Sequence, residues 1–254
     1  MGSIRIALQL YSVRDDCARD LSGTLETVAD IGYEGVEFAG YYGRSAGELR
    51  DLLDGLGLAV AGSHISIDSL LGGRLRETIC FNRVLGNKYL IVPGLPEHMR
   101  GSKAAWIRVA RVFNEIAERL KPEGMRVGYH NHMVEFRPID GETAWDVFFS
   151  STTPEVVMQL DVGNAMRGGL SIEDVFDVIR RYPGRLKTIH LKEFSRVNEK
   201  ALIGEGEVDW PELIDLCRRI GGTEWFIVEQ ETYPYPPLES VKRCLANLRD
   251  MLGL

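Results

Sequence analysis

The second half of the sequence carries histidine and carboxylate side chains at the ends of short apolar segments. In chain order these side chains are His130, His132, Asp161, His190 and Glu229. Imidazole and carboxylate groups together suit Mn²⁺, Co²⁺, Fe²⁺ or Zn²⁺ better than Ca²⁺. Because no cysteine thiolate belongs to this group, we expect an open, catalytic type of metal site rather than a closed structural one.

Eight short apolar segments alternate with longer helical patterns along the chain. The predicted strands cover residues 4–10, 35–38, 59–64, 89–92, 126–131, 156–161, 186–191 and 225–229. The predicted helices cover residues 21–31, 46–56, 74–85, 103–120, 144–149, 172–181, 210–220 and 238–252. Such alternation is typical of βαβ units and a parallel sheet. Eight units in 254 residues, with no linker between them, predict a single (β/α)₈ TIM barrel over residues 1–254.

An open, doubly wound sheet is the competing α/β architecture. Such a sheet tends to carry a glycine-rich phosphate turn after its first strand. Residues 11–15 here are Tyr-Ser-Val-Arg-Asp, without a glycine. The sequence therefore favours the closed barrel.

The working side chains of α/β barrels lie at the C-terminal ends of the strands and in the loops after them. Polar residues at those positions are Gln9, Tyr11, Glu37, His64, His130, Asn131, His132, Glu135, Asp161, Asn164, His190, Lys192, Glu229, Gln230 and Glu231. A single buried histidine at a strand end is more often structural, but groups on strands five to eight would converge at one side of the mouth. Lys192 could still be a solvated surface lysine, and Glu37 could pair with a neighbouring basic side chain.

The composition argues against a nucleic-acid or membrane partner. The net charge is −7, whereas binding to a phosphate backbone requires a basic face. No apolar segment approaches the roughly 18 residues that cross a bilayer. Four scattered cysteines without a CxxC pair indicate free thiols in a reducing compartment. We therefore expect a cytoplasmic protein.

Four segments resemble the xylose isomerase-like TIM-barrel superfamily. They are residues 129–132 (Tyr-His-Asn-His), 160–164 (Leu-Asp-Val-Gly-Asn), 190–193 (His-Leu-Lys-Glu) and 228–231 (Val-Glu-Gln-Glu). The superfamily includes sugar phosphate isomerases/epimerases, D-tagatose 3-epimerase, inosose dehydratase and endonuclease IV. The resemblance covers essentially the whole chain and implies a TIM barrel, one divalent metal ion and a small sugar substrate. Family analogy also implies a homo-oligomer.

The epimerase branch implies a metal ion held by Glu, Asp, His and Glu from strands five to eight. Asp161, His190 and Glu229 match the last three positions. The first position departs, because His130 stands where the family has glutamate. His132 is hard to separate from His130, since side chains two residues apart on a strand point the same way.

The same resemblance implies residues that bind the substrate. Arg196 stands six residues after the strand-seven histidine, where the epimerases have an arginine, and Asn164 stands where they have a histidine. The full set of candidate substrate-binding residues is His64, His132, Asn164, Arg196, Glu37 and Gln9.

Replacing the strand-five glutamate changes the implied acid–base chemistry. A metal-bound imidazole has no lone pair free to accept a proton, so Glu229 remains as the obvious base. Glu135, Lys192 or His132 could supply a second proton. We therefore predict a metal-dependent isomerase or epimerase of a sugar, sugar phosphate or cyclitol, acting beside a metal-polarised carbonyl. The alternatives are an inosose dehydratase-like lyase and, ranked lower, a non-catalytic sugar-binding barrel or an endonuclease IV-like phosphodiesterase.

Overall fold

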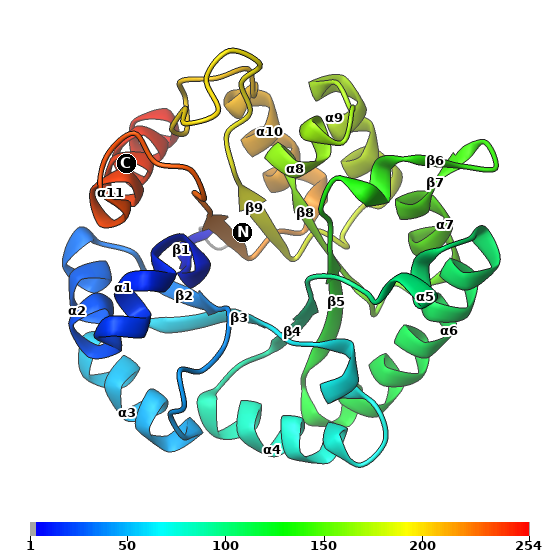
Figure 1. The fold of residues 1–254 in the computed structure, drawn as a ribbon, viewed down its shortest axis with the longest axis horizontal. Helices are drawn as coiled ribbons and strands as arrows, with labels where there is room; N and C mark the ends of the chain where they lie inside the picture. Colours follow the sequence, from blue (N-terminus) through cyan, green and yellow to red (C-terminus); the bar gives the residue numbers. More distant parts are fainter. Residues whose placement is uncertain (1–3, 254) are drawn as a thin grey trace.

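Eight parallel strands close into a barrel in the computed structural model, which describes residues 4–253 (Figure 1). Around the barrel the order is β1-β10-β9-β8-β5-β4-β3-β2, and β1 closes the ring by pairing with both β2 and β10. The strands are β1 Arg5–Gln9, β2 Gly35–Phe38, β3 Ala59–His64, β4 Tyr89–Val92, β5 Arg126–His130, β8 Val157–Asp161, β9 Thr188–Leu191 and β10 Trp225–Val228. The predicted (β/α)₈ barrel is confirmed.

The longer helices form the outer ring in Figure 1. They are α2 Leu21–Ile31, α3 Ala46–Leu56, α4 Arg74–Leu85, α6 Lys103–Leu120, α7 Ala144–Ser151, α9 Ile172–Arg181, α10 Trp210–Leu216 and α11 Pro237–Leu252. Local sequence sets several of their ends. Ser45 and Ser171 begin α3 and α9 with capping boxes. In each, the serine side chain accepts from the backbone N–H three residues on, and the carboxylate of that residue accepts from the serine N–H. Gly32 ends α2 at φ 104°, a conformation that favours glycine.

Short elements were not predicted from the sequence. They are η1 Leu10–Val13, α1 Arg14–Arg19, η2 Ile67–Leu70, α5 Glu97–Arg100, η3 Lys121–Glu123, η4 Val134–Phe136, the antiparallel pair β6 Pro138–Ile139 and β7 Glu142–Thr143, and α8 Val162–Arg167. Segments of one or two turns are too short to show a hydrophobic period. The helix predicted over 210–220 is α-helical only as far as Leu216. It then changes into a π-helical turn, η5 Cys217–Gly221.

Two apolar clusters hold the barrel together. The larger one packs between the strands and the surrounding helices. The smaller one fills the barrel interior on the N-terminal side of the polar strand-end residues and consists of Ala7, Ala61, Tyr89, Ile91, Val157, Trp225 and Ile227. Towards the C-terminal ends of the same strands the interior side chains become polar, and the candidate site lies there.

Thiols and membrane spans also bear on the sequence expectations. Within residues 4–253 all four cysteines are free thiols, of which Cys80 alone is exposed. No helix in this part of the chain is long and apolar enough to cross a membrane.

Candidate functional site

A cavity of about 840 Å³ opens at the C-terminal ends of the strands. Its walls come from the ends of all eight strands and the loops after them. The lining residues are Tyr11, Ala39, Gly40, His64, Ser66, Pro93, Gly94, His130, His132, Met133, Asn164, Arg167, Lys192, Glu193, Glu199, Glu229, Gln230, Glu231 and Thr232. The site is therefore at the end of the barrel where we expected it.

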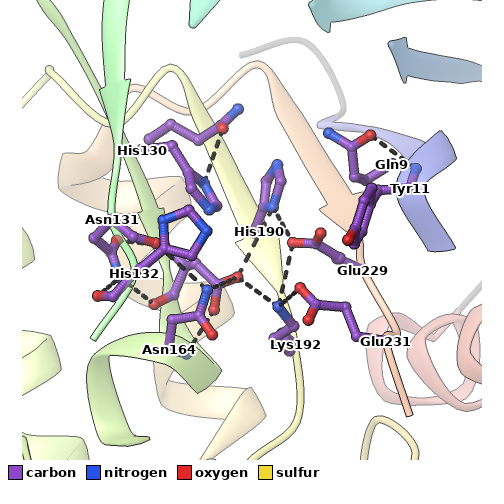
Figure 2. Close-up of polar contacts among 12 residues, drawn as sticks. Gln9, Tyr11, His130, Asn131, His132, Asn164, His190, Lys192, Glu229 and Glu231 are labelled. Carbon is purple, nitrogen blue, oxygen red and sulfur yellow. Dashed lines mark hydrogen bonds and ion pairs between the residues drawn. The ribbon is translucent and has the colours of Figure 1, made fainter. Parts of the chain in front are cut away.

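Four side chains of metal-binding type meet at the base of this cavity. They are His130, Asp161, His190 and Glu229, all buried, and one ligand atom of each lies within 4.8 Å of the others. Figure 2 shows His190 between His130 and Glu229. A shared ion requires donors this close, because its bonds to nitrogen and oxygen are roughly 2.0–2.2 Å long.

His190 lies between two carboxylates. Its Nε2 is 2.5 Å from Oε2 of Glu37, and its Nδ1 is 2.7 Å from Oε2 of Glu229 and 3.9 Å from Oδ2 of Asp161. Burial alone would lower the pKa of His190, but the charges of Glu37 and Glu229 raise it to about 10. Both N–H groups therefore donate, Nε2–H to Glu37 and Nδ1–H to Glu229, and Nδ1 is the nitrogen that faces the other candidate ligands.

Lys192 is buried beside the same carboxylates and is no solvated surface lysine. Its Nζ lies 2.6 Å from Oε1 of Glu231, 3.3 Å from Oδ2 of Asp161 and 3.5 Å from Oε2 of Glu229 (Figure 2). Burial opposes its charge, but these carboxylates raise the pKa of Lys192 above its usual range. Lys192 is thus a charged ammonium group on the cavity wall.

The charges around this cluster fit a divalent cation. The carboxylates of Glu37, Asp161, Glu229 and Glu231 surround only two side chains that can carry positive charge, His190 and Lys192. A divalent ion would replace the proton on Nδ1 of His190, because that nitrogen can bind a metal only through its lone pair. Burial, together with the nearby charge of Glu229, raises the pKa of Asp161. Burial would likewise raise the pKa of Glu229, but Lys192 and His190 hold it well below its usual range. The remaining negative charge, on oxygen and imidazole donors without sulfur, suits Mn²⁺, Co²⁺, Fe²⁺ or Zn²⁺.

Gln159 holds two of the histidines and was missed by sequence reasoning. Its Oε1 lies 3.1 Å from Nδ1 of His130 and 2.9 Å from Nε2 of His64. Its Nε2 donates to Oε1 of Glu37 at 2.7 Å and to Oγ1 of Thr188 at 2.9 Å. A signal was available, because Gln159 precedes Asp161 by two residues on one strand and must point the same way.

Glu37 and Gln9 were predicted to bind substrate, but the structure places both beneath the cavity. Gln9 is fully buried and donates from Nε2 to Oε2 of Glu37 at 2.7 Å. Glu37 pairs with His190 and His64, not with a lysine or arginine. Burial opposes the charge of Glu37, yet these two imidazoles lower its pKa. Gly62 leaves the necessary space, since a Cβ there would lie 2.7 Å from Oε1 of Glu37.

Two asparagines fix the position of Asp161. Asn164 donates to its carboxylate twice, from the backbone N at 2.7 Å and from Nδ2 at 3.1 Å. Asn131 exchanges two hydrogen bonds with the Asp161 backbone, which ties the end of β5 to the end of β8. Asn164 also lines the cavity, as do His64 and His132, so these three predicted substrate-binding residues can be reached from the cavity.

Glu135 and Arg196 are not brought to the cavity, contrary to expectation. The buried Glu135 carboxylate accepts from the Tyr129 hydroxyl at 2.7 Å and from the His132 backbone N at 2.8 Å, so both its oxygens are occupied in holding the loop after β5. The Arg196 side chain is 70% exposed and pairs with Glu207 at 2.5 Å within the loop after β9. Arg196 was chosen by counting six residues from the strand-seven histidine. That count predicted neither the course of the loop nor the ion pair that Arg196 forms with Glu207.

Comparisons with known proteins agree with this architecture. A family model described as xylose isomerase-like TIM barrel matches residues 25–251. The rhizopine catabolism protein MocC of Rhizobium meliloti is 24% identical over 98% of this chain and 89% of its own length. The inosose dehydratase of Serratia proteamaculans is 24% identical over 89% of this chain and 88% of its own length.

Solved structures share the fold. A sugar phosphate isomerase/epimerase from Parabacteroides distasonis superposes with a TM-score of 0.82 at 22% identity, covering 97% of this chain and 96% of that one. A D-psicose 3-epimerase superposes with a TM-score of 0.71 at 16% identity, covering 99% and 100% of the two chains.

Proposed function

The chain belongs to the xylose isomerase-like TIM-barrel family, and from this premise we propose that it is a metal-dependent, carbohydrate-modifying enzyme, an isomerase or epimerase. The substrate would be a small sugar, sugar phosphate or cyclitol with a carbonyl group. One observation carries the proposal: the His130, Asp161, His190 and Glu229 cluster lies at the base of an 840 Å³ cavity. A cavity of this size suits a small molecule.

The four clustered side chains would hold one divalent ion, Mn²⁺, Co²⁺, Fe²⁺ or Zn²⁺. Such an ion supplies Lewis acidity, which polarises a carbonyl group and stabilises negative charge on its oxygen. Neighbouring residues of the chain hold these donor side chains in place. Asn164 and Asn131 hold Asp161, and Glu37 holds His190, so the donors are arranged before any ligand arrives.

Glu229 is the proposed base. Its low pKa keeps it ionised at neutral pH, and its carboxylate reaches the cavity wall. In isomerisation it would take the proton from the hydroxyl-bearing carbon next to the carbonyl and deliver it to the former carbonyl carbon, while the hydroxyl proton moves to the former carbonyl oxygen. In epimerisation a proton would instead return to the same carbon on its opposite face. The Lys192 ammonium, 3.5 Å from Glu229, can donate a proton to an oxygen that gains negative charge. His130 stands where a second carboxylate would be needed for symmetric two-base epimerisation.

Dehydration is the second candidate, favoured by the relatives named inosose dehydratase that match over most of both chains. The first step is the same removal of a proton by Glu229. The electron pair then expels the hydroxyl group on the next carbon, the carbon–oxygen bond breaks, and Lys192 provides the proton that lets the oxygen leave as water. The two candidates share proton removal and differ only in the step after it.

The experiment is metal analysis of the purified protein, followed by assay on a panel of ketoses, keto-inositols and 3-keto-sugars. We expect one bound ion per chain, loss of turnover with a chelator, and recovery with one of the four metals. A product of unchanged mass supports isomerisation or epimerisation, and a product that has lost water supports dehydration. A protein that binds sugar without metal and without turnover would overturn the proposal in favour of a sugar-binding barrel.

A further inference from the structure

His130, the histidine on the fifth strand of the chain, has two ring nitrogens. A residue on the neighbouring strand β8, Gln159, determines which of them carries the proton. A neutral imidazole carries one N–H and one lone pair, and only the lone pair can bind a metal ion. The hydrogen bond made by the second nitrogen determines which tautomer is present. For His130 that bond runs from Nδ1 to Oε1 of Gln159, at 3.1 Å.

The orientation of the Gln159 amide is fixed by its own partners. Glu37 is a carboxylate that already accepts from Gln9 and His190, so it can only accept from Gln159 as well. The NH₂ group of Gln159 must therefore face Glu37, at 2.7 Å, and its oxygen must face the imidazoles. Turning the amide over would place two oxygens against each other inside a buried site.

Because the amide oxygen only accepts, both imidazole nitrogens beside it must be donors. His64 donates from Nε2 at 2.9 Å, and His130 donates from Nδ1 at 3.1 Å. The lone pair of His130 is therefore on Nε2. The His130 and His190 rings lie next to each other in Figure 2, and their centroids are 4.6 Å apart.

We propose that Gln159 is a positioning residue that locks His130 in the Nδ1–H tautomer, so that Nε2 is the atom offered to the metal ion. This inference rests on the proposed metal site. It explains how imidazole can occupy a position where the resemblance implies a glutamate. A carboxylate can bind a metal ion through either oxygen, whereas an imidazole must be in the right tautomer. Gln159 selects that tautomer, and its own orientation is fixed by Glu37, which also orients His190.

The test is NMR of protein labelled with ¹⁵N in its histidines, without added metal, with His130 assigned by the signals missing from His130→Asn. We expect the Nδ1–H tautomer in the wild type. Gln159→Met keeps the volume but removes the acceptor, so we expect the Nε2–H form of His130 to appear. Gln9→Met is the matched control: Gln9 is also buried and bonded to Glu37, but it has no bond to His130, so the tautomer should not change.

Metal affinity is measured on the same proteins by calorimetry with the ion found in the wild type. We expect Gln159→Met to weaken binding about 10–100-fold, as is typical when a partner of a ligand is removed. An Nε2–H tautomer in the wild type, which requires no variant to fold, would overturn the inference. So would unchanged affinity in a folded Gln159→Met. A wild type that binds no ion would instead overturn the proposed function, and with it the metal-binding half of this inference.

Discussion

The two ends of the barrel interior are built from the same strands but from opposite kinds of side chain. On β1 the inward residues are Ala7 and then Gln9, and on β8 they are Val157 and then Gln159. On β10 Ile227 is followed two residues later by Glu229. All six side chains are buried, so burial does not distinguish the two ends.

The difference between the ends lies in what burial does to the free energy of folding. Apolar groups at the N-terminal end stabilise the fold by about 25 cal/mol per Å² removed from water. Polar groups at the C-terminal end cost desolvation energy unless each is paired. Here they are paired with one another, through Gln9, Glu37 and Gln159, around His190. We infer that the N-terminal end serves stability and the C-terminal end serves chemistry.

The sharpest test of this division, with the largest expected effect, is Glu229→Gln. An amide is not a useful base, so we expect proton exchange at the carbon next to the substrate carbonyl to fall about 10²–10⁴-fold. The measurement is solvent deuterium incorporation at saturating metal, so that weaker binding of the ion does not affect the result. Stability is measured beside it by urea denaturation and should fall, because the amide has nearly the same shape but removes the buried charge that pairs with Lys192 and His190. Exchange at close to the wild-type rate would mean that another residue, Lys192 or His132, is the base.

Ile227→Ala is the matched change on the same strand, two residues before Glu229. Ile227 is fully buried within the inner cluster, so removing most of its side chain leaves a cavity. We expect the free energy of unfolding to fall by about 2–5 kcal/mol, measured by urea denaturation. Turnover per folded molecule should stay close to that of the wild type. A variant that keeps its stability but loses turnover would contradict the division between the two ends.

The sequence predicted the scaffold better than the connections between site residues. Strands and helices repeat a local hydrophobic period, and the C-terminal end of each strand can be located from the period itself. His130, Asp161, His190 and Glu229 were predictable because they stand at such ends, and the structure places them together. Their biochemical roles stay predictions.

The features that could not be predicted depend on contacts between distant segments. The spacing of Gln159 from Asp161 predicts that it points into the barrel, but nothing along the chain reveals that two imidazoles and Glu37 surround it. Glu135 and Arg196 were chosen from their places in loops, and the course of a loop is set by its own hydrogen bonds. Side-chain identity at a strand end is therefore informative, whereas an offset counted into a loop is not.

Glu135→Gln tests the reassignment of that residue from catalysis to loop anchoring. Its two oxygens accept from Tyr129 and from the His132 backbone, and an amide can replace only one of these acceptors. Leaving one buried donor unpaired should lower stability by about 1–3 kcal/mol. The loss of turnover should be far smaller than in Glu229→Gln, and it should appear mainly in KM, since His132 lines the cavity. A loss of kcat equal to that of Glu229→Gln would return Glu135 to the catalytic machinery.

Arg196→Ala should have the smallest effect, although the family resemblance gives an arginine at that offset a role in substrate binding. The guanidinium is largely exposed and pairs with Glu207 at the surface of the loop after β9. Exposed ion pairs contribute at most about 1 kcal/mol to stability, because water and salt screen them. We therefore expect kcat and KM near wild-type values, measured beside Arg196→Lys as a control that keeps the charge. A KM that rises in Arg196→Ala and recovers in Arg196→Lys would show that the loop carries Arg196 onto the substrate during turnover. The loop after β9 would then form part of the substrate site in addition to Lys192 and Glu193. The division of the barrel into a stabilising end and a chemical end would have to include this loop.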